Sequence, residues 1–420
     1  MTATLFTWIF LSALAVSTLV RFWLAQRQAR YVLANRGSVP AAFREKISLS
    51  AHHKAADYTI AKLRVSILDI ALGAAVLLLL TIGGLLQWGS ELLARVLEPG
   101  GIWHGAAIVA CVVLFLSVLE LPIDLYRTFS VESRFGFNRM TLRLYLGDLA
   151  KQALVGALIG LPLVTLALWI MDGIGSLWWL YVWILWTGFN LTLLLVYPTF
   201  IAPLFNKFAP LQDTSLKERI ESLLSRCGFR ASGLYVMDGS KRSSHGNAYF
   251  TGFGAAKRIV MFDTLLSRLA PPEVEAVLAH ELGHFRKHHV WKRIAVMFSI
   301  SLALLWGLGQ LIGKSWFYEG LNVSSRDPAM ALLLFFLIVP VFLFLLQPIG
   351  SLYSRTHEYE ADRYAAAQSS PGELINALVK LYQDNAATLT PDPVHSAFYD
   401  SHPPAALRVA RLAAHAGTHP

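Results

Sequence analysis

Cysteine is nearly absent from this sequence, with only Cys111 and Cys227 among 420 residues. Cys111 lies in an apolar stretch and Cys227 in a polar one, so neither a disulfide framework nor a cysteine metal site is supported. Charged residues are also scarce, at 15% of the chain, whereas 55% of the residues are hydrophobic and the mean hydropathy is +0.50. Ordinary soluble enzymes of this length do not have such a composition, so we expect a membrane protein.

Basic residues are missing before the first apolar run, residues 5–20, and Arg21 follows it directly. This charge order is the reverse of that in a cleavable signal peptide, so we expect the run to remain as a membrane anchor. The formal net charge of +9 could indicate a nucleic-acid partner. The basic residues, however, lie in loops that alternate with apolar stretches, which the positive-inside rule explains without nucleic acid.

Seven stretches are long and apolar enough to cross a bilayer, which takes about 20 helical residues. They are residues 4–24, 65–88, 105–123, 153–171, 177–197, 294–313 and 329–346. The loops richest in Lys and Arg are residues 21–64 and 127–151, which places the N-terminus outside and the C-terminus in the cytosol. The lipid bilayer is therefore an expected partner.

The pattern HExxH is formed by His280, Glu281 and His284 within VLAHELGHF. Residues four apart share one face of a helix, so the two imidazoles can bind one Zn²⁺ while Glu281 points at a water molecule on the metal. This spacing is typical of a zinc hydrolase, which needs a third ligand.

The best candidate for that ligand is Glu358, in SRTHEYEADRYA, with Asp362 four residues later on the same helix face. One carboxylate can bind zinc while the other orients a ligand histidine. Glu360 falls on nearly the opposite face and is expected to be solvated. HExxH followed by a distant ExxxD is the thermolysin-like arrangement.

His288 and His289 are nearer along the chain, but the pattern HExxHxxGxxH requires Gly and His where Lys287 and Val290 stand. We therefore expect both histidines at a solvated or headgroup-facing end of the helix.

The two motifs lie in two polar segments of a predicted four-part organisation. Residues 1–204 hold spans one to five with basic cytosolic loops, residues 205–292 are a cytosolic segment with HExxH, residues 293–350 hold spans six and seven, and residues 351–420 are a cytosolic segment with ExxxD. The first polar segment predicts a helix over 213–227, strands over 233–237, 247–253 and 258–262, and a helix opened by Pro271 and Pro272. A further helix is expected over 373–383. The predicted fold is mainly α: a polytopic membrane protein with seven transmembrane helices and a small α+β zinc metalloprotease domain assembled from two cytosolic segments.

Two other protein classes are alternatives for this sequence. A site-2-type intramembrane protease carries HExxH inside a transmembrane helix, but here charged residues flank the motif and argue against that class: Glu273, Glu275, Arg286, Lys287 and Lys292. A transporter or membrane scaffold with a non-catalytic metal site is the alternative outside the enzymes, although neither repeated halves nor clear mid-span ionisable residues support it.

Several motifs in the same order resemble the type I CAAX prenyl proteases, seven-span membrane zinc endopeptidases that process C-terminally farnesylated proteins. The resemblance runs from about residue 55 to residue 412. It includes FGFNRMT, APLFNKFAPL, KRSSHGNAYFTGFG, KRIVMFDTLL, VLAHELGHF, SRTHEYEADRYA and SAFYDSHPP.

The resemblance implies one Zn²⁺ per chain, bound by His280, His284 and Glu358, with Glu281 as general base. It implies that Asp362 orients a ligand histidine. In the family, the spans enclose a water-filled chamber capped by the catalytic domain.

The resemblance also implies a substrate site. Asn247, Ala248 and Tyr249 would lie on an edge strand that pairs with the substrate backbone, and His402 and Arg408, in SHPPAALR, would stabilise the oxyanion. On local grounds alone, a turn residue is the simpler interpretation of Asn247, and a loop histidine before two prolines is the simpler one of His402.

The resemblance also implies the substrate, which is expected to be a CAAX-type or membrane-associated protein or peptide, possibly farnesylated, that is cleaved near its C-terminus. Abundant alanine, more Arg than Lys, and short loops suggest a bacterial cytoplasmic membrane with the catalytic segments in the cytosol; in a eukaryote the endoplasmic reticulum membrane is expected. Because prenylated CAAX proteins are not expected as native bacterial substrates, membrane-protein quality control without prenyl specificity is the alternative role.

Overall fold

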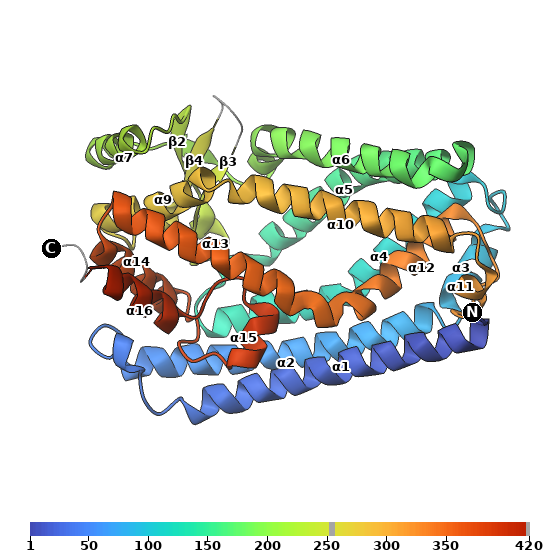
Figure 1. Ribbon diagram of the computed structural model, residues 1–420, viewed down its shortest axis with the longest axis horizontal. Coiled ribbons are helices and arrows are strands. Elements are labelled where there is room, and N and C mark those ends of the chain that lie inside the picture. Colours follow the sequence, from blue (N-terminus) through green and yellow to red (C-terminus); the bar gives the residue numbers. More distant parts are fainter. Residues whose placement is uncertain (252–256, 417–420) are drawn as a thin grey trace.

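The computed structural model describes residues 1–251 and 257–416. Within this part, seven helical segments are long and apolar enough to cross a membrane, which confirms the predicted number. They are Ala3–Ala34, Leu49–Leu80, Ile102–Glu132, Leu142–Gly173, Gly175–Leu204, His289–Leu311 and Pro328–Gln368. The long helices run along the long axis of the molecule, with the N-terminus near one end and the C-terminus at the other (Figure 1).

The largest buried core of the membrane helices lies near the N-terminal end of the molecule. A buried apolar core there joins α1 (Ala3–Ala34), α4 (Ile102–Tyr126), α5 (Leu142–Gly173), α11 (Ser315–Glu319) and α12 (Pro328–Leu343). Phe10, Phe317 and Met330 are completely buried in it. Large apolar side chains such as Leu158 and Trp169 are exposed on the outside of the bundle, where lipid rather than water would contact them.

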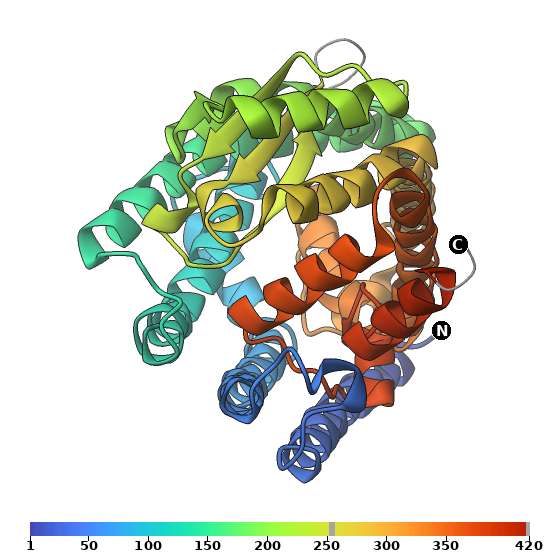
Figure 2. The ribbon, with the colours of Figure 1, turned by 90° about the vertical axis from the view of Figure 1, so that its left-hand side faces the viewer.

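The first two spans are much longer than a bilayer requires. At 1.5 Å per residue, the 32 residues each of α1 and α2 (Leu49–Leu80) extend about 48 Å, against a hydrocarbon thickness of about 30 Å. The prediction that residues 21–64 form a basic loop is therefore wrong for most of its length, because both helices continue into this basic stretch. Their ends stand beside the C-terminal segment (Figures 1 and 2).

The second span also ends earlier than predicted. Helix α2 stops at Leu80, and a separate helix, α3 (Leu85–Leu93), follows instead of a continuous span to Trp88. Gly84 explains the break, because it has a left-handed backbone with a φ of 74° that most residues avoid in a helix.

A four-stranded sheet lies at the C-terminal end of the molecule, with strand order β1-β2-β4-β3. Strands β2 (Gly233–Met237) and β4 (Arg258–Phe262) are parallel and match the prediction, whereas β1 (Phe208–Pro210) and β3 (Ala248–Thr251) pair antiparallel at the two edges. Strand β1 was not predicted, because three residues ending in proline show no alternating pattern. The prediction of a strand over 247–253 is correct from Ala248 to Thr251, and Gly252 and Phe253 lie outside the described residues.

The two polar segments share one hydrophobic core. Ile220 of α7 (Thr214–Arg226), Met261 of β4 and Leu278 of α9 (Pro271–Arg286) pack in the same buried cluster as Leu374 of α14 (Pro371–Asp384) and Leu412 of α16 (Ala405–Ala416). Asp213 caps α7 as expected, by accepting from the N–H of Leu216. The remaining helices at this end are α8 (Asp263–Leu266) and α15 (Pro393–Tyr399).

The two motif helices are direct extensions of the last two spans. Helix α9 ends at Arg286 and α10 (His289–Leu311) begins three residues later, after a left-handed His288. A single tight turn, Phe344–Leu346, separates α12 from α13 (Gln347–Gln368). The hairpin of α10 and α12 thus returns the chain to the same end, where α13 packs along α9 (Figure 1). The remaining span, α6 (Trp178–Val196), lies beside α10.

Candidate metal centre

The N-terminal half of α9 is held by ion pairs in the protein. Glu273 accepts hydrogen bonds from the backbone N–H of Ala270 and from Lys380, both at 2.7 Å. Glu275 pairs with Arg219 at 2.7 Å and Arg226 at 2.5 Å. These carboxylates are buried but neutralised, and they anchor the helix that presents HExxH.

The histidines of HExxH and the first acid of ExxxD come together at one point. The Nε2 atoms of His280 and His284 are 3.2 Å apart, and they lie 3.5 and 3.4 Å from the two carboxylate oxygens of Glu358. These three residues form the potential metal-binding group found among residues 1–251 and 257–416. Residues from α9 and α13, 74 or more positions apart in the sequence, thus converge as predicted.

Two further properties of the donors fit a cation. The Oε2 atom of Glu358 is buried and has no hydrogen-bond partner among the described residues, which is costly unless another group binds it. Burial alone would lower the pKa of His280, but hydrogen bonds to Asp362 and Glu358 raise it to about 9. Burial and the nearby His280 lower the pKa of His284 to about 3. The cluster therefore favours one positive charge, which a metal ion can supply in place of the proton.

Asp362 and Arg408 form a buried pair behind His280. The Oδ1 atom of Asp362 lies 2.8 Å from Nδ1 of His280, and the carboxylate accepts two hydrogen bonds from Arg408, at 2.6 and 2.8 Å. A hydrogen bond from Nδ1–H to Asp362 leaves Nε2 of His280 free as a ligand. The guanidinium of Arg408 thus faces Asp362, and it also contacts Nδ1 of His280 at 3.5 Å and the side chain of Tyr382.

His289 contradicts the expectation of a solvated helix end. Only 1% of its side chain is exposed, Nδ1 lies 3.0 Å from Nδ1 of His284, and Nε2 lies 2.8 Å from Oε2 of Glu360. The ring stacks on His357 with centroids 4.0 Å apart. Glu360 is therefore a hydrogen-bond partner of His289 rather than a merely solvated acid, whereas His288 is exposed as expected. The five-residue spacing from His284 to His289 crosses the turn between α9 and α10, so a single-helix pattern could not find this contact.

Gly283 lets the two motif helices approach closely. A Cβ atom at this position would lie 2.9 Å from the Cα of Ala361 on α13. Real Cβ contacts are almost never so short, so a larger residue would push α13 and its carboxylates away from α9. The sequence pattern HExxH accepts any residue at position 283, so it does not reveal the role of Gly283.

Glu281 and His402 are the other two titratable residues of the motifs that act on the donor cluster. Glu281 has no hydrogen-bond or ion-pair partner among the described residues, and burial raises the pKa of its carboxyl group. His402 lies with Nε2 3.5 Å from Oε2 of Glu358, and 61% of its side chain is exposed to the cavity that it lines. The walls of that cavity limit hydration and lower the pKa of His402, so the ring is neutral near pH 7.

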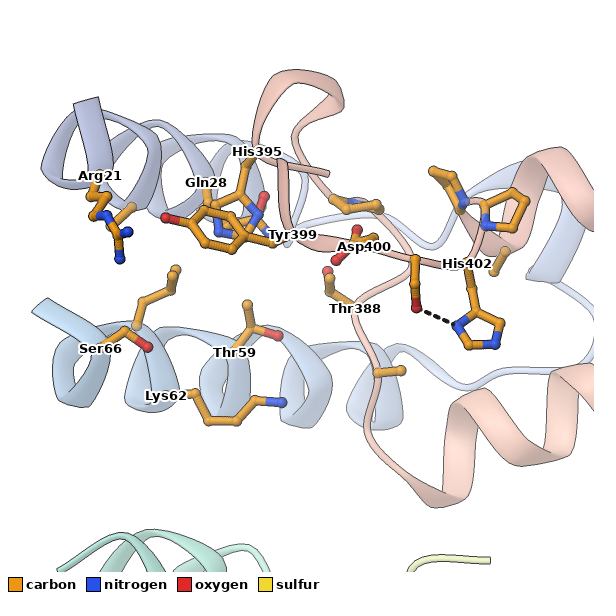
Figure 3. A pocket seen from close by; sticks show the side chains of 18 of the residues that line it. Arg21, Gln28, Thr59, Lys62, Ser66, Thr388, His395, Tyr399, Asp400 and His402 are labelled. Carbon is orange, nitrogen blue, oxygen red and sulfur yellow. Dashed lines mark hydrogen bonds between the residues drawn. The ribbon is translucent and has the colours of Figure 1, made fainter. Parts of the chain in front are cut away.

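The loop with His402 is fixed to both helical layers. Asp392 pairs with Arg27 of α1 at 2.9 Å and caps α15, while Arg355 of α13 donates to the carbonyl oxygen of Asp400 at 3.1 Å. A cavity of about 810 Å³ extends from His402 between this loop and the facing sides of α1 and α2 (Figure 3).

The predicted substrate strand is at the edge of the sheet. Ala248 and Tyr249 belong to β3, which pairs only with β4 among the described strands, and Asn247 immediately precedes it. Ala248 is buried in the core shared with α9, whereas Asn247 is exposed. Within the described part of the chain, no strand pairs with the outer edge of β3, so this edge can accept an added strand.

Comparisons with known proteins agree with this geometry. The family described as CAAX prenyl protease N-terminal, five membrane helices, matches residues 28–207, and peptidase family M48 matches residues 210–416. CAAX prenyl protease 1 of Saccharomyces cerevisiae is 34% identical over 420 residues, covering 93% of this chain and 91% of that protein. A CAAX prenyl protease 1 homolog of Oryza sativa is 37% identical over 315 residues, covering 74% of this chain and 73% of that protein.

The fold matches as well. The crystal structure of S. mikatae Ste24p superposes with a TM-score of 0.89 at 30% identity, over 97% of this chain and 98% of that one. Family membership implies a metal at the His/Glu cluster, and the donor set found there is of the type that binds one. The chain therefore belongs to peptidase family M48, as an integral membrane metalloendopeptidase of the CAAX prenyl protease 1 type.

Proposed function

We propose that His280, His284 and Glu358 bind one Zn²⁺ per chain. The observation that carries the proposal is the 3.2 to 3.5 Å separation of their donor atoms. Tetrahedral zinc with ligands at about 2.0–2.1 Å requires donors about 3.3 Å apart. Two imidazoles and one carboxylate leave the fourth position for water or substrate, as in catalytic rather than structural zinc sites.

Zinc, when bound, lowers the pKa of a water ligand to about 7 and polarises the scissile carbonyl group. Glu281 accepts the proton of the attacking water and later passes it to the leaving amine. Its lack of a competing partner leaves the carboxylate free for this exchange, and burial raises its pKa toward a value suited to a proton shuttle.

His402 and Arg408 have different parts in this proposal. A neutral His402 beside the donors can donate an N–H to the oxyanion that develops during attack. Arg408 holds Asp362, which in turn orients His280, so we assign it chiefly to positioning. The role of Arg408 in stabilising the oxyanion, which the family resemblance implies, stays a prediction.

The substrate strand would add to the open edge of β3. Backbone pairing at Asn247, Ala248 and Tyr249 is independent of side chains, so it would hold an extended peptide beside α9 without selecting its sequence. We propose that the substrate is the C-terminal region of a CAAX protein, prenylated or otherwise membrane-associated, because the named relatives are CAAX prenyl proteases.

Cleavage of one CAAX peptide in farnesylated and unprenylated forms tests the substrate class. We expect a higher kcat/KM for the farnesylated peptide with purified protein in detergent or nanodiscs. Equal rates would count against lipid recognition and favour a quality-control protease without prenyl specificity. A Glu281→Gln preparation serves as the blank for contaminating peptidases.

We also propose a membrane and an orientation for this protein. The charge pattern of the loops supports catalytic segments in the cytosol, and the composition supports a bacterial cytoplasmic membrane. Cysteine accessibility in intact cells tests the orientation: a cysteine introduced at exposed Glu218 should resist a membrane-impermeant thiol reagent added from outside.

A further inference from the structure

The cavity beside His402 is lined by polar residues on the facing sides of α1 and α2. On α2, Thr59, Lys62, Ser66 and Asp69 recur at three- or four-residue intervals and face the cavity together. On α1, Arg21 and Gln28 face it from the opposite side. Figure 3 shows Thr59, Lys62 and Ser66 on α2 and Arg21 and Gln28 on α1, with Lys62 extending along α2 in the direction of the end where His402 lies.

Among the described residues, no carboxylate directly contacts the positive charges of this wall, although Glu132 and Asp400 act on the charge of Lys62 from farther away. Lys62 forms no ion pair among the described residues, and its Nζ lies 4.3 Å from the centre of the Tyr58 ring. Arg21 likewise has no carboxylate partner in the described part, and its guanidinium lies 4.2 Å from the centre of the Phe344 ring. The aromatic contacts hold both cations in place without cancelling their charge.

The same wall has two carboxylates. Asp69 shares Arg127 with Asp124, at 2.8 and 2.7 Å, and Asp400 has no ion pair among the described residues. His395 adds no charge, because burial lowers its pKa. The wall therefore carries two cations and two carboxylates, and neither Lys62 nor Arg21 directly contacts a carboxylate among the described residues.

We propose that Lys62, supported by Arg21, binds the free C-terminal carboxylate of the substrate in this cavity. The inference rests on the proposed function, because a substrate cleaved near its C-terminus carries one carboxylate within a few residues of the scissile bond. Three extended residues span about 10 Å, so the carboxylate enters the space beyond His402 when the scissile bond is at the metal donors. A carboxylate there forms a charge-assisted hydrogen bond to Lys62.

Equilibrium binding can test the carboxylate site separately from cleavage. The probe is a dye-labelled farnesylated CAAX peptide, made as the free acid and as the C-terminal amide. Its affinity is measured by fluorescence anisotropy on Glu281→Gln protein, so that it stays intact. We expect the acid to bind about 10- to 100-fold more tightly than the amide, as for a hydrogen bond to a charged group.

Adding Lys62→Gln should remove most of that preference by weakening acid binding and leaving amide binding unchanged. Lys62→Arg should restore part of it. Arg64→Gln is the matched control, because it removes one charge from an exposed position two residues away on α2. Thermal unfolding of each variant reports any loss of folding.

The proposal is overturned if the acid and amide bind equally, or if Lys62→Gln weakens both peptides to the same extent, as a purely structural lysine would. These outcomes are distinct from failure of the proposed function, which would appear as absent cleavage of the farnesylated peptide by the wild-type protein. An acid preference that survives Lys62→Gln would place the carboxylate elsewhere and would also overturn the assignment.

Discussion

The charged groups at the catalytic end form two sets that differ in how they are neutralised. Behind the metal donors, Asp362, Arg408 and Glu360 are each held by a partner within the protein. Across the cavity, Lys62 and Arg21 have no carboxylate partner among the described residues. The paired set can orient the donors before metal or substrate arrives, whereas the unpaired set is suited to a charge that arrives with the substrate.

This difference separates the effects of substitutions. Changes in the paired set should alter metal affinity and the rate for every peptide, whereas changes at Lys62 should alter only the response to a terminal carboxylate.

Removing the base should have the largest effect. Glu281→Gln keeps the size of the side chain but cannot accept a proton, so we expect kcat to fall by about 10²- to 10⁴-fold with zinc content unchanged. Cleavage of a quenched fluorescent peptide and elemental analysis measure the two quantities. Glu218→Gln, at an exposed position on α7, is the control. A Glu281→Gln protein that retains zinc and cleaves at the wild-type rate would remove the assigned mechanism.

Removing the partner of His284 should act on metal affinity. His289→Phe keeps a ring that stacks on His357 but loses the contacts with His284 and Glu360, so we expect zinc to bind about 10- to 100-fold more weakly. Competition with a zinc chelator gives the affinity. His288→Asn, at an exposed left-handed position, should leave it unchanged. Equal losses in both variants would mean that the buried contact does not orient the ligand.

Separating the two motif helices should have a moderate effect. Gly283→Ala places a methyl group against the backbone of α13, and such overpacking costs about 1–3 kcal/mol of folding free energy. We expect a lower unfolding temperature together with weaker zinc binding. Gly350→Ala, on α13 with open space around the added carbon, should not weaken zinc binding. Normal zinc affinity in Gly283→Ala would show that the helices can part without disturbing the donors.

The pH dependence should show the smallest change. Because burial raises the pKa of Glu281, its carboxylate form is lost at a higher pH than for an ordinary glutamate of pKa 4.5. As the pH is lowered, kcat/KM should therefore begin to decline at a pH above 4.5. Zinc content is measured at each pH to separate this from metal loss. The lowered pKa of His402 means that His402→Gln should reduce the rate without moving the acid limb. A limb that coincides with zinc loss would contradict the assignment to Glu281.

The sequence was informative wherever chemistry follows a short helical period. The seven spans, His280 and His284 four residues apart, and Glu358 with Asp362 could all be predicted, because residues on one helix face need no knowledge of tertiary structure. Convergence of α9 and α13 could be expected only because both motifs fell on one side of the predicted membrane.

Contacts between separate helices could not be predicted from the sequence. His289 reaches His284 across a turn between two helices, and Gly283 matters only because α13 packs against it. The extension of α1 and α2 into the basic stretch 21–64 was not predicted. When hydropathy alone is considered, basic residues within a helix resemble a basic loop. The cavity wall with Lys62 therefore had no sequence signal of its own.

The zinc content of Glu358→Gln tests the central claim most directly, since that claim joins a carboxylate from α13 to two imidazoles from α9. Elemental analysis of purified wild-type protein should give about one zinc per chain, and Glu358→Gln should fall well below that value while Glu218→Gln matches the wild type. A Glu358→Gln protein that keeps a full complement of zinc would contradict the account.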